Sequence, residues 1–344
     1  MLYAGIDVHK RCTQICIENE DGEILERRIL TERRRLLEEF GERPKMRILL
    51  ESATESEWVA RCLEGVGHEV IVGDPNFAPM YAQRSRRIKT DRRDARALLE
   101  ACKLGAYRPA HRCSDAHKRV RARISARDLL VQTRSKCISF VRSLLRQEGI
   151  KPERKSSITF AQRAREIGAP ETLAVEIAPV LDLIDTLTEK IRRADERVSE
   201  IAKDETHRRL MSVPGVGPVT AVAFVSTLDD PRRFHGPRQV RAYLGLVPRE
   251  QSSGEKTSRG RITKQGGTRM RRLLVQAAWA VLRSRPTAEA EPLRRWTTNV
   301  ASRRGKYVAV VALARRLAGI LFAVWRDGTT FRAPGPLGGG EVTT

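Results

Sequence analysis

Two aspartates three residues apart, Asp91 and Asp94, lie in one of the most basic stretches of this 344-residue chain. From Arg84 to Arg96 there are seven Lys or Arg residues and only these two acids. The basic side chains suit nucleic-acid phosphates, and carboxylates are ligands that Mg²⁺ prefers. The segment therefore indicates metal-dependent chemistry on a nucleic-acid backbone.

Two further acids fit the same chemistry. Asp7 lies inside a short apolar run that predicts a strand, where a charged side chain is unfavourable without a partner or a ligand. Glu51 follows Leu50 at the carboxyl end of another predicted strand, the edge where open α/β sheets place their sites. Four converging carboxylates repel one another. Two Mg²⁺ ions, roughly 3.5 to 4 Å apart, would relieve that repulsion and polarise a phosphodiester.

Each acid also has an ordinary explanation. Asp7 could face a turn, Asp91 could only cap a helix, and Glu55 and Glu57 compete with Glu51, although both follow the strand end. The joint occurrence of a strand Asp, a strand-end Glu and a helical Asp-x-x-Asp pair favours the metal site.

The elements that would position these acids form the first predicted domain, residues 1–110, which has the element order of an RNase H-like (RuvC-like) α/β fold. A helix that begins at Thr90 or Asp91 would place both aspartates of the pair on one face. The predicted strands are Leu2–Val8, Thr13–Glu18, Ile24–Leu30, Met46–Leu50 and Val70–Val72; the predicted helices are Glu32–Phe40, Trp58–Leu63 and Asp91–Lys103.

The second predicted segment, residues 111–204, is helical. A long basic helix is expected over His111–Arg146, and apolar residues from Leu173 to Ile201 alternate steps of four and three, as in a coiled-coil seam. We expect the uninterrupted part of this second helix to begin near Pro179. An intramolecular helical hairpin and a dimerising coiled coil both fit this pattern.

The third predicted domain, residues 205–332, is mainly α and opens with a helix, a turn containing Gly215 and Gly217, and a second apolar helix. This pattern predicts a helix-hairpin-helix, whose turn amides can hold a DNA phosphate, although such turns also serve packing alone. The Gly- and Pro-rich end, residues 333–344, is predicted to be disordered.

A second basic stretch carries candidate hydroxyl nucleophiles. Between Lys256 and Arg272 there are seven Lys or Arg residues and no acid, and Ser252 and Ser253 directly precede this stretch. A positive field would stabilise the charge that develops when a hydroxyl attacks a phosphate, although Ser-Ser-Gly is most often an ordinary turn. The predicted nucleic-acid contacts are Arg86, Arg87, Lys89, Arg92, Arg93, Gly215, Gly217, Arg249, Lys256, Arg259, Arg261 and Lys264.

Composition narrows the class of protein. The net charge of +23 makes nucleic acid the expected partner, and 40% apolar residues are enough for ordinary cores. No run reaches the roughly 18 apolar residues of a spanning helix, so we expect no membrane. Six cysteines without a C-x-x-C pair indicate free thiols in a reducing compartment, which predicts a cytoplasmic protein.

Taken together, the acids, the glycine turn and the segment from Gly245 to Gly267 resemble the DEDD-type insertion-sequence transposases of the IS110 family, including its IS1111 branch. The resemblance covers nearly the whole chain. It implies that Asp7, Glu51, Asp91 and Asp94 are Mg²⁺ ligands, and that Ser253, or else Ser252, attacks DNA to form a phosphoserine link. It also implies element-end and target DNA, a structured non-coding guide RNA (the bridge RNA) and a dimeric or tetrameric assembly as partners.

Two other functions stay open on sequence alone. A metal-dependent nuclease of the Holliday-junction resolvase kind would need the four acids but not Ser253. A non-catalytic basic DNA-binding protein would use the acids only to pair with neighbouring arginines. The acids and Ser253 are expected in different domains, so the seam from Leu173 to Ile201 would set how they meet, within one chain or between chains.

Overall fold

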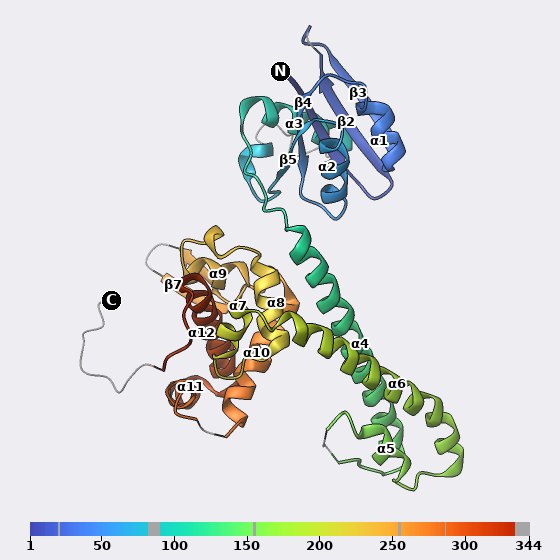
Figure 1. The fold of residues 1–344 in the computed structure, drawn as a ribbon, viewed down its shortest axis with the longest axis vertical. Helices are drawn as coiled ribbons and strands as arrows, with labels where there is room; N and C mark the ends of the chain where they lie inside the picture. Colours follow the sequence, from blue (N-terminus) through green and yellow to red (C-terminus); the bar gives the residue numbers. More distant parts are fainter. Residues whose placement is uncertain (20, 82–89, 154–155, 254–255, 286, 334–344) are drawn as a thin grey trace, which may run out of the picture. The chain divides into compact units, whose positions relative to one another are not determined.

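The computed structural model describes residues 1–333 except for 20, 82–89, 154–155, 254–255 and 286 (Figure 1). The chain divides into two compact units, Met1–Cys113 and Ser114–Thr344, which we call the N-terminal and C-terminal units. The further division near residue 204 stays a prediction. The predicted disordered tail lies, apart from Ala333, outside the described residues.

The N-terminal unit is a mixed α/β domain, as predicted. Its five-stranded sheet has the order β3-β2-β1-β4-β5; β1 pairs antiparallel with β2 and parallel with β4. A helical connection separates each parallel strand from the next, as this geometry requires. The elements are β1 (Leu2–Val8), β2 (Cys12–Glu18), β3 (Ile24–Leu30), α1 (Arg33–Phe40), β4 (Met46–Glu51), α2 (Ser56–Glu64), β5 (Glu69–Gly73), the short 3-10 helix η1 (Ala78–Tyr81) and α3 (Asp91–Leu104).

The two faces of this sheet carry different helices because side chains alternate along each strand. Ala4, Ile6 and Val8 of β1 point into the core that α1 and α2 cover. Tyr3 packs in the clusters on the opposite face, which α3 covers, and Asp7 has the same parity in β1. The alternation therefore places Asp7 on the side of the sheet where α3 lies.

Gly5 allows α3 to approach β1 closely. A Cβ atom at Gly5 would lie 2.1 Å from the backbone nitrogen of Leu99 and 2.2 Å from the carbonyl oxygen of Ala95. Both contacts are with α3 backbone, which cannot swing aside as a flexible side chain can. The position of the first turn of α3 over the sheet thus depends on the missing side chain at residue 5.

The C-terminal unit is mostly helical. It begins with a helical hairpin in which α4 and α6 pack together, with the short α5 against them (Figure 1). The elements are α4 (Asp115–Gln147), α5 (Phe160–Arg165), α6 (Glu171–Ile201), α7 (Glu205–Met211), α8 (Pro218–Leu228), the 3-10 turn η2 (Pro231–Arg233), α9 (Pro237–Tyr243), β6 (Pro248–Ser253), β7 (Lys256–Ile262), α10 (Thr268–Arg283), α11 (Glu291–Arg304) and α12 (Lys306–Asp327).

The predicted seam packs within the chain. Ile177 and Ile184 of α6 and Val141 and Leu145 of α4 are buried in one cluster, which confirms the intramolecular hairpin and leaves a dimer as a prediction. The expected helix start near Pro179 is wrong, since α6 begins at Glu171 and Pro179 lies inside it. The hydrogen bond that Pro179 cannot donate belongs to an exposed part of the helix, where water can replace it.

The largest core of the C-terminal unit lies among α8, α10 and α12. By length and composition α12 is apolar enough to cross a membrane, although Arg315 and Arg316 interrupt its apolar run. Leu313, Leu317 and Phe322 of α12 are fully buried in the protein core instead. The hydropathy of α12 is explained by this packing.

Candidate active site

Asp7 and Glu51 lie at the same edge of the sheet. β1 and β4 are parallel with Ile6 opposite Leu50, so the residues that follow, Asp7 and Glu51, come at matching positions near the carboxyl ends of the two strands. Leu49 packs on the α3 face, and the alternation of β4 gives Glu51 the same parity. The Tyr81 hydroxyl donates a short hydrogen bond to Oε2 of Glu51.

Asp91 and Asp94 occupy the first turn of α3. The Thr90 side chain caps this helix by accepting a hydrogen bond from the backbone N–H of Arg93 at 3.3 Å, as predicted. Asp94 is buried and Asp91 is exposed, so the two carboxylates have different environments. The cap and the approach of α3 to Gly5 together fix where this turn lies.

His9 joins Asp7 to Asp91. Its Nε2 lies 3.2 Å from Oδ2 of Asp7 and 3.3 Å from Oδ1 of Asp91. One ligand atom from each of the three residues falls within 4.8 Å of the others, which is the spacing of groups that can hold a metal ion. The strand Asp and the helix Asp, 84 positions apart in the sequence (91 minus 7), therefore meet at one point.

Asp7 is held in a costly position. Burial is the largest effect on its carboxyl and raises its pKa; His9 lowers that pKa, and Asp94, Asp91 and Glu51 raise it further. Among the described residues, buried Oδ2 of Asp7 accepts no well-aligned hydrogen bond, and its contact with Nε2 of His9 at 3.2 Å is one of distance only. Burial and three neighbouring carboxylates thus disfavour the ionised form of Asp7, and His9 offsets only part of this effect.

Ser252 and Ser253 lie at the end of a β-hairpin that the sequence did not predict. β6 pairs antiparallel with β7, with Ser252 opposite Thr257 and Ser253 opposite Lys256. Gly254 and Glu255, which join the two strands, are outside the described residues. The backbone therefore places both serines at the tip of the hairpin.

Comparisons with known proteins agree over both units. A family model described as a transposase of the DEDD IS110 type matches residues 4–150, and one described as the IS116/IS110/IS902 transposase family matches residues 207–291. The chain is 30% identical over 337 residues to the transposase for insertion sequence element IS1111A of Coxiella burnetii, covering 95% of this chain and 90% of the relative. The chain belongs to the IS110 transposase family.

Other transposases match over similar lengths. A probable family 20 transposase of Pseudomonas aeruginosa is 29% identical, covering 95% of this chain and 98% of the relative. The transposase for insertion sequence element IS1328 of Yersinia enterocolitica is 28% identical, covering 95% and 97%. Both the acid-bearing unit and the serine-bearing unit of this transposase thus lie within the matched length.

The predicted nucleic-acid contacts of the transposase are partly described. Arg92 is exposed and pairs with Glu26, and Arg93 is exposed in the same turn of α3. Arg249, Arg261 and Lys264 are exposed in the C-terminal unit. Arg86, Arg87 and Lys89 lie outside the described residues, as do the side chains of Lys256 and Arg259.

The glycine turn joins α7 to α8. Gly215 has φ +79°, and a Cβ there would lie 2.4 Å from the carbonyl oxygen of Ala277 in α10, so one side of the turn is closed by packing. Nothing lies within 4 Å of a Cβ at Gly217, the N-cap residue of α8. Of the two glycines, Gly217 is the one with open space around it.

Sequence reasoning missed His9 and Tyr81. The signal for His9 was available, because a residue two positions after Asp7 has the same strand parity and can face the same site. Tyr81 gave no such signal, since it lies in the short 3-10 turn η1 and meets Glu51 only through the fold.

Proposed function

We propose that this transposase excises and inserts its element through a covalent phosphoserine link between DNA and Ser253, assisted by Mg²⁺ held by Asp7, Glu51, Asp91 and Asp94. The effect of three other carboxylates on the buried and poorly compensated Asp7 carries this proposal. Such a cluster destabilises the folded protein unless a bound ligand offsets the repulsion, and sites of this kind are typically functional.

The residues present suit a divalent cation with oxygen ligands. Asp7 and Asp91 offer carboxylate oxygens within 4.8 Å of each other, and Asp94 and Glu51 add two more carboxylates that act on Asp7. When bound, Mg²⁺ would polarise a phosphodiester and neutralise the charge that develops on it. The protein's own part is to place and orient these carboxylates, with the Tyr81 hydroxyl holding Glu51.

The sheet order supports an RNase H-like (RuvC-like) assignment for the N-terminal unit. Three antiparallel strands followed by two strands parallel to β1 have the predicted connectivity, and Asp7 and Glu51 fall at neighbouring strand ends. We also propose that the α7–α8 turn acts as a helix-hairpin-helix, with the open backbone at Gly217 facing a DNA phosphate.

A serine ester is the step that separates recombination from simple cleavage. Oγ of Ser253 bonds to phosphorus and gives up its proton, while the bond from phosphorus to the departing deoxyribose oxygen breaks and that oxygen takes a proton. The ester conserves the bond energy, and attack by a new DNA hydroxyl reverses the same step and releases Ser253. Water as nucleophile would instead leave cut ends.

The partners that we propose are element-end DNA, target DNA, a structured non-coding guide RNA and further copies of the chain, acting in the cytoplasm. The net charge of +23 supports nucleic-acid partners, and six free cysteines suit a reducing compartment.

One experiment tests the chemistry. Purified protein is incubated with Mg²⁺, labelled element-end DNA and the adjoining transcript, then denatured and examined for protein–DNA adducts. We expect an adduct for wild type and Ser252→Ala, and none for Ser253→Ala or Asp94→Ala. Cleavage without an adduct would support the resolvase-like nuclease instead. Neither adduct nor cleavage, from a protein that still binds DNA, would leave only a binding function.

A further inference from the structure

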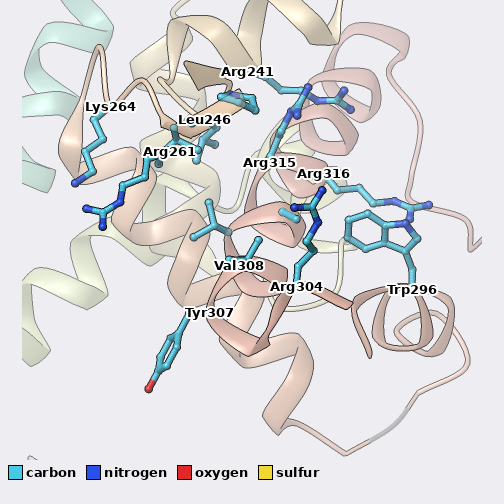
Figure 2. A pocket seen from close by; sticks show the side chains of 15 residues that line it. Arg241, Leu246, Arg261, Lys264, Trp296, Arg304, Tyr307, Val308, Arg315 and Arg316 are labelled. Carbon is cyan, nitrogen blue, oxygen red and sulfur yellow. The ribbon is translucent and has the colours of Figure 1, made fainter. Parts of the chain in front are cut away.

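A cavity of about 950 Å³ lies in the C-terminal unit between the β6–β7 hairpin and α12 (Figure 2). This size is at the upper end of the range of about 300 to 1,000 Å³ typical of small-ligand sites. None of the described residues that line the cavity is Asp or Glu. Its basic lining residues are Arg241, Arg261, Lys264, Arg304, Arg315 and Arg316.

Arg241, Arg315 and Arg316 lie close together, and none of them has an acidic partner in the part of the chain that the structure describes. Arg241 rests against Gly319 of α12, where a Cβ would lie 2.3 Å from a guanidinium nitrogen. Among the described residues, the buried Nε of Arg241 has no hydrogen-bond partner. Burial lowers the pKa of Arg241, and Arg315, Arg238 and Arg316 lower it further by repulsion. Positive charges clustered in this way favour the binding of an anion.

Aromatic and aliphatic side chains share the same cavity. Trp296 of α11 lies under the guanidinium of Arg316, 4.8 Å from the ring centroid. Tyr307 and Val308 at the start of α12 are 81% and 55% exposed, although both are large apolar side chains. Figure 2 shows Tyr307 projecting away from the arginines at one end of the cavity. Exposed aromatic side chains are a usual platform for unpaired bases.

We propose that this cavity binds an unpaired nucleotide of single-stranded DNA, with a phosphate on Arg315 and Arg316 and the base against Tyr307 and Val308. The apolar part distinguishes this ligand from a free phosphate, and a duplex offers it no unpaired base, because duplex bases stay stacked until they are extruded.

The choice of DNA rests on the proposed function. Pro248 of β6 and Ile262 of β7 line the cavity, and the same two strands carry Ser253 at their tip. At about 3.3 Å per residue, Ser253 lies roughly 16 Å along β6 from Pro248. A strand end held on Ser253 would thus lie on the same hairpin that lines the cavity.

Binding by the full-length protein tests the proposal without any cleavage. Fluorescence anisotropy in EDTA compares a labelled 12-nucleotide DNA strand, the RNA of the same sequence and the DNA duplex. We expect Tyr307→Ala to bind the single DNA strand about tenfold more weakly, while Phe140→Ala, another exposed aromatic residue, binds as wild type does.

Charge is tested with paired substitutions. We expect Arg315→Gln with Arg316→Gln to reduce the slope of log K against log salt by about 1.4 for single-stranded DNA, from about 0.7 per cation. Arg123→Gln with Arg197→Gln removes two exposed arginines from α4 and α6 as a control and should change the slope less.

Three results would overturn the proposal: equal single-strand affinity for wild type and Tyr307→Ala, an equal loss of duplex binding in that variant, or a loss confined to RNA. This binding is measured in EDTA and does not need the serine to react. A wild type that forms no adduct but shows the Tyr307 effect would therefore refute the serine chemistry while leaving this cavity as a DNA site.

Discussion

Nε2 of His9 lies 3.2 Å from Oδ2 of Asp7, at the point where β1 ends and the first turn of α3 passes over the sheet. The same nitrogen lies 3.3 Å from Oδ1 of Asp91. The protein therefore offsets part of the repulsion among its clustered acids with a histidine, and this contact explains why His9 opposes the other effects on the pKa of Asp7.

Asp7→Asn should raise the melting temperature at neutral pH by a few degrees while abolishing adduct formation. The folded pKa of Asp7 lies above its ordinary value of 3.8, so the folded state holds this proton when the unfolded state has lost it. Stability of wild type should accordingly fall as pH rises from about 4 through the raised pKa, and the advantage of Asp7→Asn should appear over that window.

Calorimetry at several pH values, without metal, measures this difference. Asp21→Asn, at an exposed turn, serves as the control and should change little. Addition of Mg²⁺ should then stabilise wild type more than Asp7→Asn. A wild type that is as stable as Asp7→Asn at every pH would contradict the interpretation that the ionised Asp7 destabilises the folded protein.

Tyr81→Phe should reduce adduct yield about tenfold at limiting Mg²⁺ and less at high Mg²⁺. The variant removes the hydroxyl that holds the Glu51 carboxylate, and groups that orient metal ligands typically change metal affinity by about 10- to 100-fold. A titration of adduct yield against Mg²⁺ measures the effect. Tyr107→Phe is the matched control in the same unit, and an identical titration for both variants would argue against a positioning role.

Gly5→Ala should destabilise the N-terminal unit by about 1 to 3 kcal/mol and lower adduct yield. The new methyl group meets α3 backbone at 2.1 and 2.2 Å, so α3 must move, and Asp91 and Asp94 move with it. Gly65→Ala is the control, because residue 65 has helical φ and its Cβ would meet no atom closer than 3.3 Å. Chemical denaturation and the adduct assay measure the two effects; normal activity in Gly5→Ala would refute this account.

Ile184→Glu with Ile191→Glu should destabilise the α4–α6 hairpin by at least about 2 to 5 kcal/mol, since both side chains are buried in the seam. Val175→Glu with Leu183→Glu places the same charges at exposed positions of α6 and should be tolerated. Thermal unfolding gives the stability, and light scattering with the adduct assay gives assembly and function. Intact association and recombination in the seam variant would refute a role for the seam in assembling the active complex.

Local patterns determined most of the secondary structure. The alternation around Asp7, the buried run before Glu51 and the capped start of α3 at Thr90 were readable because each depends on neighbours within a few residues. Residues 171–178 are an exception to this agreement. They are helical, and α6 continues past Pro179, because helix propensity and the packing of Ile177 against α4 stabilise this part of the helix. The local sequence also does not predict the hairpin of β6 and β7, because it is polar and is typical of a turn.

The sequence by itself determined which residue types could do chemistry: the four acids, the basic segments and the serines. Only the tertiary structure decided that His9 joins Asp7 to Asp91, that Tyr81 holds Glu51, and that arginines from α9 and α12 share one cavity with Tyr307. The physical reason is that these contacts depend on how closely packed elements approach. That approach is set by details such as the missing side chain of Gly5, which no local pattern encodes.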